Sequence, residues 1–230
     1  MNKREFLRKA TGASMGLAAL TAAPSLLAAS HKTHSKHAPN ATERRRSRFL
    51  NVPLVTHEGK IVHFYDDLMK DKTVLINFMY ASCADSCPMT TSNLKKVYTA
   101  LGDRVGKDVF MYSITLDPEH DTPHLLKSYA DLFKTGPGWT FLTGTKDRIE
   151  QLRANLGYKN SDPVADKDRT QHIGVVKFGI ERLERWGMAP ALGSPVAIAE
   201  YIDWLEPGAK QPSLEILRGR YEDPGNITMG

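Results

Sequence analysis

The chain contains only two cysteines among its 230 residues, and this shortage excludes several classes of protein. Two thiols cannot form the disulfide framework of a small secreted scaffold, and they cannot supply the four thiolates of a structural zinc or iron–sulfur site. Strong compositional bias is also absent, because hydrophobic residues make up 41% and charged residues 25% of the sequence. These values exclude wholesale disorder and collagen-like repeats. Any chemistry of the cysteines therefore depends on one pair.

Excess positive charge is absent beyond the first 48 residues. The net charge is +5, but residues 1–30 contribute +3 and residues 31–48 contribute +5, so the remaining 182 residues carry −3. A nucleic-acid-binding domain concentrates basic residues on its folded body, whereas a short basic arm can contact any anionic surface. We therefore expect no nucleic-acid partner.

Residues 1–30 have the pattern of an export signal. A basic start, Lys3–Lys9, precedes an alanine-rich apolar stretch, Ala10–Ala29, and small residues there offer a cleavage site. The start is similar to a twin-arginine signal with Lys3 in place of the first arginine, which leaves the ordinary secretory route open. A retained membrane anchor is the alternative to cleavage, because the stretch is long enough to span a bilayer. A cleaved signal and a retained anchor both place the protein, by prediction, in the periplasm or cell envelope, where a cysteine pair can cycle between dithiol and disulfide.

One domain, residues 49–206, is expected between two loose ends. Residues 31–48, rich in His and Arg, are expected to be a flexible linker, and residues 207–230 an extended tail. Strands are expected near Val52–Leu54, Ile61–Phe64, Thr73–Tyr80, Phe110–Leu116, Trp139–Leu142, His172–Phe178 and Arg182–Met188, and helices over Cys87–Leu101, Pro123–Phe133, Lys146–Leu156 and Pro195–Leu205. A turn at Gly179–Glu181 is expected to join the last two strands. This order predicts an α/β fold with a mixed central sheet flanked by helices.

The two cysteines lie in the segment Cys83-Ala-Asp-Ser-Cys87-Pro88, directly after a strand that is predicted to be buried. Cys87 is expected at the start of a helix, where free N–H groups and the helix dipole favour a thiolate. The spacing lets both sulfur atoms face the same small volume. The pair can therefore close a redox-active disulfide or bind a soft metal ion, and two thiolates alone do not decide between these functions.

Two further motifs follow the cysteines in the chain. Asp117-Pro-x-x-Asp121-Thr-Pro comes after the next buried strand, and His172-x-x-x-Val begins a later one. Together with Cys83-x-x-x-Cys87-Pro, these motifs resemble the Sco (SenC-type) family of thioredoxin-fold copper chaperones. The resemblance covers about residues 49–206 and implies a thioredoxin-like fold for them.

The resemblance also implies a copper site and its partners. It implies that the copper ligands are Cys83, Cys87 and His172. Three aspartates are implied to lie near the metal or a partner protein: Asp85, Asp117 and Asp121. The implied recipient is the copper-site subunit of cytochrome c oxidase or another copper protein, and a copper donor and a thiol reductant are implied upstream. The ligand types suit this cargo, because soft thiolates select Cu(I) and an imidazole suits either copper oxidation state.

An exported thiol–disulfide reductase that acts through Cys83 and Cys87 is the alternative function. Thioredoxin-type reductases carry Cys-x-x-Cys and a proline directly before the strand that faces the cysteines. This chain has three residues between its cysteines and Gln171-His172 in the place of that proline. The sequence therefore favours copper handling, although the two functions are compatible because Cu(I) loading requires a reduced cysteine pair.

Overall fold

The computed structural model describes residues 40–82, 86–167 and 174–209. Three predicted site residues, Cys83, Asp85 and His172, lie outside these ranges, as do the predicted export signal and residues 210–230 of the predicted tail. Within the described ranges, no helix has the length and apolar character needed to cross a membrane.

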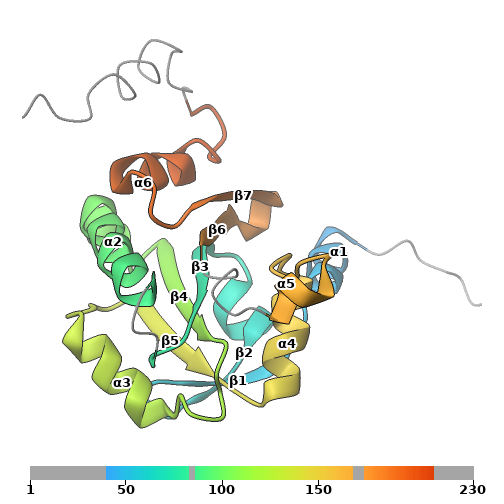
Figure 1. Cartoon of the computed structure of the whole chain (residues 1–230). Helices are drawn as coiled ribbons and strands as arrows, with labels where there is room; N and C mark the ends of the chain where they lie inside the picture. Colours follow the sequence, from blue (N-terminus) through green and yellow to red (C-terminus); the bar gives the residue numbers. More distant parts are fainter. Residues whose placement is uncertain (1–39, 83–85, 168–173, 210–230) are drawn as a thin grey trace, which may run out of the picture. The chain divides into compact units, whose positions relative to one another are not determined.

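Seven strands form one mixed sheet in the order β2-β1-β5-β4-β3-β6-β7 (Figure 1). The strands are β1 (Pro53–Thr56), β2 (Ile61–His63), β3 (Thr73–Met79), β4 (Val109–Thr115), β5 (Trp139–Thr143), β6 (Val175–Ile180) and β7 (Arg185–Pro190). The central strands β3, β4 and β5 are parallel, whereas β1, β2, β6 and β7 make antiparallel pairs. The mixed sheet with flanking helices confirms the predicted thioredoxin-like fold class.

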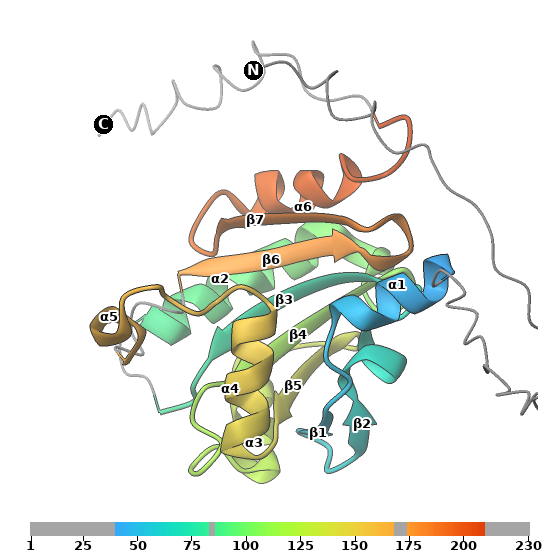
Figure 2. The ribbon, with the colours of Figure 1, turned by 90° about the vertical axis from the view of Figure 1, so that its right-hand side faces the viewer.

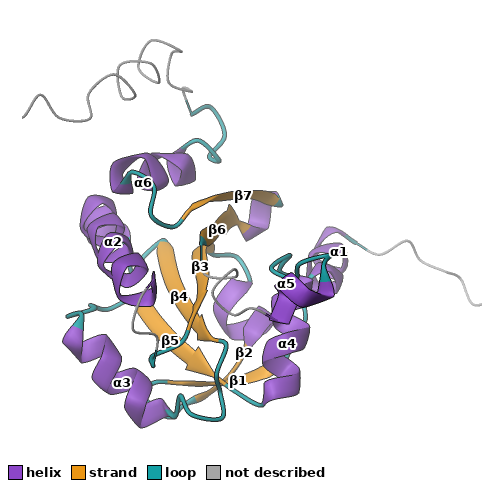
Figure 3. Ribbon diagram, viewed as in Figure 1, coloured by secondary structure: helices purple, strands orange, loops and turns teal. Residues whose placement is uncertain are grey.

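Helices cover both faces of the sheet (Figures 2 and 3). They are α1 (Ala41–Arg48), α2 (Ser86–Leu101), α3 (Pro123–Leu132), α4 (Lys146–Asn155), α5 (Pro163–Lys167) and α6 (Pro195–Asp203). One apolar cluster joins the sheet to α2, α3 and α6, and a second joins the opposite face to α4 and the helical turn Phe64–Met69. Side chains of β3 alternate between the two clusters because successive residues of a strand point to opposite faces. All seven residues of β3 are buried, as its largely apolar sequence predicts.

The predicted helix starts agree closely with the structure. The Thr122 hydroxyl accepts the N–H of Leu125 at the start of α3, and the Ser194 hydroxyl accepts the N–H of Ala197 at the start of α6. A proline follows each of these capping residues, in the position where a missing N–H costs no helical hydrogen bond. These local patterns depend on few residues and are therefore readable from sequence.

The predicted turn at Gly179–Glu181 is wrong, because β6 continues through Gly179 and Ile180. Ile180 pairs with both β3 and β7, and the connection is a short 3₁₀ turn, Glu181–Leu183. A Cβ atom on Gly179 would lie 2.1 Å from the Trp186 ring on β7. This glycine therefore permits close packing of an aromatic ring inside a strand, rather than a turn.

Residues 41–48, expected to belong to a flexible linker, instead form helix α1. Asn40 and Glu43 make a reciprocal capping box at its start. The Arg45 guanidinium donates from Nε to the buried Glu181 carboxylate, at 3.1 Å. Glu181 also accepts the Tyr65 hydroxyl at 2.8 Å and the Asp71 N–H at 2.9 Å. Capping and this long-range ion pair stabilise a helix that has no buried residue of its own.

Candidate functional site

The topology brings the three sequence motifs toward one edge of the sheet. The carboxyl ends of parallel strands β3 and β4 lie at the same edge, which is where ligands bind in sheets of this type. The cysteine segment follows β3 in the chain, and residues 117–123 follow β4. Because β6 is antiparallel to β3, its first residue Val175 also lies at this edge. The described ends of all three motifs therefore lie at the same edge of the sheet.

Cys87 is the second residue of α2 and is fully buried. It belongs to the apolar cluster that includes Met79 at the end of β3 and Val176 at the start of β6. A soft sulfur atom in dry surroundings, in the first turn of a helix, suits a soft cation. Cys83, its predicted partner, lies outside the described ranges.

Asp121 connects the end of β4 to the turn that precedes the cysteines. Its Oδ2 atom accepts the N–H of Ala81 at 2.9 Å and the hydroxyl of Thr115 at 2.5 Å. The residue is fully buried, and this burial raises the pKa of the carboxyl, while the two hydrogen bonds act in the opposite direction. Asp121 thus holds the backbone two residues before Cys83.

Asp117, the other aspartate of this segment, shapes the same loop. Its N–H donates to the Thr115 hydroxyl at 2.8 Å, and its carbonyl accepts the N–H of Asp121 at 2.8 Å. Its carboxylate contacts the ring Nδ1 of His120 at 3.0 Å, which raises the pKa of that exposed histidine. The structure therefore places Asp121 against the cysteine turn and directs the Asp117 carboxylate toward His120.

Tyr158 is a site-supporting residue that sequence analysis missed. Its buried hydroxyl donates to the carbonyl of Ile76 on β3 at 2.9 Å and accepts the N–H of Lys177 on β6 at 3.0 Å. These two residues form the last pair between β3 and β6. Beyond them, β3 pairs with β4 alone and β6 with β7 alone, so the two strands separate toward the edge that carries the cysteines.

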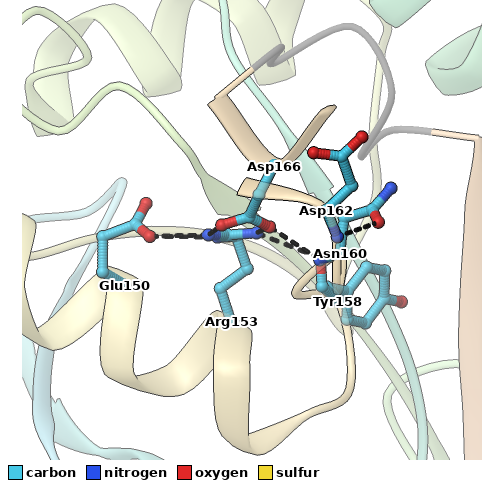
Figure 4. A network of polar contacts seen from close by, with 6 residues as sticks. All are labelled: Glu150, Arg153, Tyr158, Asn160, Asp162 and Asp166. Atoms are coloured by element: carbon cyan, nitrogen blue, oxygen red, sulfur yellow. Dashed lines mark hydrogen bonds and ion pairs between the residues drawn. The ribbon is translucent and has the colours of Figure 1, made fainter. Parts of the chain in front are cut away.

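Arg153 on α4 anchors the segment that leads toward His172 (Figure 4). Its guanidinium makes two hydrogen bonds of 2.8 Å to the Asp166 carboxylate and a third to the Tyr158 carbonyl at 3.1 Å. Only 5% of the Arg153 side chain is exposed, compared with 49% of its further partner Glu150. Helix α5, which ends at Lys167, is thereby attached to α4.

Hydrogen bonds also join the start of β6 to the cysteine-bearing helix. The Gly174 carbonyl accepts the N–H of Ala191 at 2.9 Å, and the Ala191 carbonyl accepts the Asn93 amide at 2.9 Å. Asn93 lies on α2, six residues after Cys87. The position two residues after His172 is therefore linked through Ala191, which directly follows β7, to the helix of Cys87.

A metal-ligand cluster of three or more His, Cys, Asp or Glu side chains is not found within residues 40–82, 86–167 and 174–209. Two members of the predicted set, Cys83 and His172, lie outside those ranges. The predicted ligand set thus remains a prediction, supported by the arrangement of the residues around it.

Comparison with protein families identifies the chain. A family model described as SCO1/SenC matches residues 41–176, a range that includes Cys83, Cys87 and His172. The chain belongs to the SCO1/SenC family. This match confirms the family that the three sequence motifs resemble.

Relatives of known name agree with this family membership. Protein SenC of Rhodobacter capsulatus is 32% identical over 97 residues, which cover 42% of each chain. The SCO2-like protein RC0895 of Rickettsia conorii is 32% identical over 99 residues, covering 43% of this chain and 46% of the relative. The matches therefore span less than half the length of these curated relatives.

Solved Sco structures share the fold. Bradyrhizobium japonicum ScoI with copper bound is 26% identical, with a TM-score of 0.53 over 68% of this chain and 99% of that one. The thioredoxin-like architecture is thus common to this chain and to a Sco protein that holds copper.

Proposed function

We propose that this protein binds one copper ion through Cys83, Cys87 and His172 and delivers it to the dinuclear copper site of cytochrome c oxidase. The observation that carries the proposal is the SCO1/SenC match across all three residues. The copper-bound ScoI structure of the same fold supports copper as the cargo. The identity of the recipient follows from the family resemblance.

The chemistry of the proposed ligands suits transfer rather than permanent storage. Two thiolates and one imidazole form a three-coordinate set that holds Cu(I), and such a set leaves room for a ligand from a recipient protein. Structural zinc normally requires a fourth protein ligand. Asp121 supports this function by holding the Ala81 N–H, which fixes the turn before Cys83.

A redox step precedes metal loading in this proposal. In an oxidising compartment, Cys83 and Cys87 form a disulfide, which accepts two electrons and two protons from an external dithiol reductant. That reductant is converted to its own disulfide, and the two thiols that result lose their protons when they bind Cu(I). The same dithiol can reduce cysteines of the recipient, which is the basis of the alternative reductase function.

Anaerobic titration of the reduced mature protein with Cu(I), and separately with Cu(II), tests the copper site. We expect one Cu(I) per chain, and loss of tight binding in Cys83→Ser and Cys87→Ser. His172→Ala is expected to retain some Cu(I) affinity, because two thiolates can hold the ion linearly, and to change the Cu(II) spectrum strongly. His63→Ala is the matched control, because this exposed ring lies on β2, the outer strand of the sheet, four strands away from β3.

Identical Cu(II) spectra for the wild type and His172→Ala would remove His172 from the site. Retained dithiol–disulfide activity together with that result would favour the exported reductase. A Cys87→Ser variant that still binds Cu(I) tightly would contradict the proposed ligand set itself.

We also propose that the chain is exported to the periplasm or cell envelope, with cleavage near residue 30. The basic start and alanine-rich stretch of residues 1–30 support this proposal. Intact-mass spectrometry of the protein from its native envelope is expected to show a chain that lacks these residues. A mass that includes Met1 would contradict cleavage and favour a retained anchor.

A further inference from the structure

A side chain replaces a backbone group where β1 leaves the sheet. His57 directly follows β1, and its backbone N–H donates to the Phe141 carbonyl on β5 at 2.8 Å. The Nδ1 atom of its ring accepts the Phe141 N–H at 3.1 Å. In a regular antiparallel pair, two residues exchange two backbone hydrogen bonds, so the imidazole nitrogen takes the place of the His57 carbonyl. The pairing of Thr56 with Leu142 thus continues for one more residue through a side chain.

This hydrogen bond determines where the proton of the neutral ring lies. Because the Phe141 N–H is the donor, Nδ1 must be unprotonated, and the neutral ring carries its proton on Nε2. A second proton on Nδ1 replaces the acceptor with another donor. The Phe141 carbonyl can accept that proton in place of the His57 N–H, but the Phe141 N–H loses its partner in either case.

Burial makes this loss unfavourable. Phe141 is fully buried, and the half-buried His57 ring packs edge-on against the Phe141 ring, with 5.9 Å between their centroids. A buried N–H that loses its partner has no water to replace it unless the structure opens. Burial also lowers the pKa of the His57 ring, while contact with the Phe141 backbone opposes this shift.

Among the described residues, four charged side chains line the cavity beside this ring. Glu58 and Lys60 come from the turn between β1 and β2, and Lys127 and Asp131 come from α3. Glu58 pairs with Lys60 at 2.9 Å, and Asp131 pairs with Lys127 at 2.6 Å. Burial remains the largest influence on the pKa of His57, since Glu58 and Asp131 raise this pKa whereas Lys127 lowers it.

The turn that carries His57 holds together without β5. The Thr56 N–H donates to the Lys60 carbonyl and the Gly59 N–H to the Thr56 carbonyl, each at 2.8 Å, and Gly59 adopts the positive φ of +80° that this tight turn requires. On the side of α3, a cavity of about 520 Å³ separates the turn from residues 135–140. Residues 57–60 therefore have space to move as one unit, and solvent has a route to the ring.

We propose that His57 is a pH-sensitive latch, which holds the turn 57–60 against β5 when its ring is neutral and releases the turn when the ring is protonated. The pairs that Val55 and Thr56 make with β5 keep β1 in the sheet after release. Since the pKa of His57 is lower in the folded protein than its ordinary 6.5, the latch is complete above pH 6.5 and is lost as the pH falls through the lower value.

Nuclear magnetic resonance of the imidazole nitrogens, in the reduced and metal-free protein, tests the first part of this proposal. At about pH 8 we expect the His57 ring to carry its proton on Nε2, with Nδ1 unprotonated. A ring that carries its proton on Nδ1 at this pH cannot accept the Phe141 N–H, and this result would overturn the latch.

Hydrogen exchange of single backbone amides tests the release. Between about pH 8 and about pH 5, the protection of the Phe141 N–H, corrected for the intrinsic pH dependence of exchange, should fall about tenfold, as expected for the loss of one hydrogen bond. The Thr56 N–H is the internal control, because it donates to Lys60 within the turn and should keep its protection. Equal loss at Phe141 and Thr56 would show that the hairpin unfolds as a whole, which contradicts a latch at His57.

Matched variants assign the pH dependence to the His57 ring. His57→Asn brings a carboxamide oxygen close to the position of Nδ1, which can accept the same N–H and does not titrate. We expect Phe141 to be protected at both pH values in His57→Asn and at neither in His57→Ala. His63→Asn, a change of an exposed histidine on β2, should keep the tenfold change of the wild type.

A pH-dependent loss of protection that persists in His57→Asn would assign the release to another group and overturn the proposal. The latch uses none of the proposed copper ligands, so this result would leave the copper function untouched.

Discussion

At the residue scale, single polar atoms buried beside the site determine how the strands meet. The Tyr158 hydroxyl takes the place of a backbone partner for both Ile76 and Lys177. No local pattern predicts this, because the partners lie 82 and 19 residues away in the chain. Asp121 was predicted from its motif, but its two contacts with Ala81 and Thr115 depend on tertiary structure. The motif therefore pointed to Asp121, whereas the contacts of Asp121 and the role of Tyr158 required the fold.

Tyr158→Phe is expected to destabilise the protein by about 2–4 kcal/mol, because it leaves a buried carbonyl and a half-buried N–H without their partner. Urea unfolding measured by circular dichroism provides the value. Tyr98→Phe is the control, since its hydroxyl makes one exposed hydrogen bond to Pro137, and its expected cost is below about 1 kcal/mol. Equal costs for the two variants would show that the Tyr158 hydroxyl has no special role between the strands.

Asp121→Asn is expected to increase stability at neutral pH relative to the wild type. Burial raises the carboxyl pKa in the folded protein, so folding favours the protonated form and the ionised form reduces stability. The contribution of the Asp121 carboxyl to the free energy of unfolding is fully present below the ordinary pKa of 3.8. It is lost as the pH rises through the pKa of this group in the folded protein. The amide can still accept both hydrogen bonds through its oxygen.

The gain in unfolding free energy of Asp121→Asn over the wild type is therefore expected to shrink as the pH falls toward 3.8. Unfolding curves measured across this pH range test it. Asp103→Asn, a change at an exposed position, provides the control, and its stability is expected to stay close to that of the wild type. An advantage that grew toward acid pH would reverse the sign of the linkage and contradict the raised pKa.

At the element scale, the structure separates what local sequence determines from what distant contacts determine. Strand β3 was predicted because its apolar run is sufficient for a strand buried on both faces. Helix α1 was missed although its capping box, Asn40 with Glu43, is a local signal; the ion pair that attaches the helix to the domain joins Arg45 to Glu181, 136 residues away. Gly179 was misassigned to a turn because the ring of Trp186, which requires a glycine there, comes from the neighbouring strand.

Asp166→Asn is expected to release helix α5 from α4. It weakens two charge-assisted hydrogen bonds with Arg153, a loss of about 1.5–3 kcal/mol for contacts of this type. Exchange of the Asn160 N–H, which donates to Asp166 at 2.6 Å, should accelerate, as hydrogen-exchange mass spectrometry can measure. Glu150→Gln, which affects a half-exposed partner of the same guanidinium, should have a much smaller effect. Similar acceleration in both variants would contradict the anchoring role of Asp166.

At the scale of the whole molecule, the fold brings segments that are distant in sequence to one edge of the sheet. The described residues nearest the predicted ligands are Ser82 and Ser86, on either side of residues 83–85, and Gly174 before β6. The motifs in their correct order were sufficient to predict the fold class and the family. A cavity of about 470 Å³ beside Asp121 was not predicted, because its walls come from four separate segments: residues 53–55, residue 61, residues 118–123 and residues 143–148.

Copper is therefore expected to stabilise the whole reduced domain against unfolding. A ligand that binds the folded state alone adds about 2.7 kcal/mol when its free concentration is a hundred times its Kd. Thermal unfolding under anaerobic conditions should show a higher Tm for the wild type with Cu(I), and no comparable increase for Cys87→Ser. An equal increase in the variant would place the stabilising ion elsewhere on the protein.

The two outermost strands have a consequence for how copies of the protein meet at high concentration. Strand β2 has only three residues, and β7 begins with a charged arginine, Arg185, and ends at Pro190, which has no N–H to donate. Long, flat edge strands are the usual starting points for sheet extension from one molecule into the next. At one edge, β2 is too short for a second copy to pair with it over a long stretch. At the other edge, the charge of Arg185 and the missing N–H of Pro190 disfavour pairing with β7. A protein built this way can accumulate at high concentration without joining its sheets into fibres.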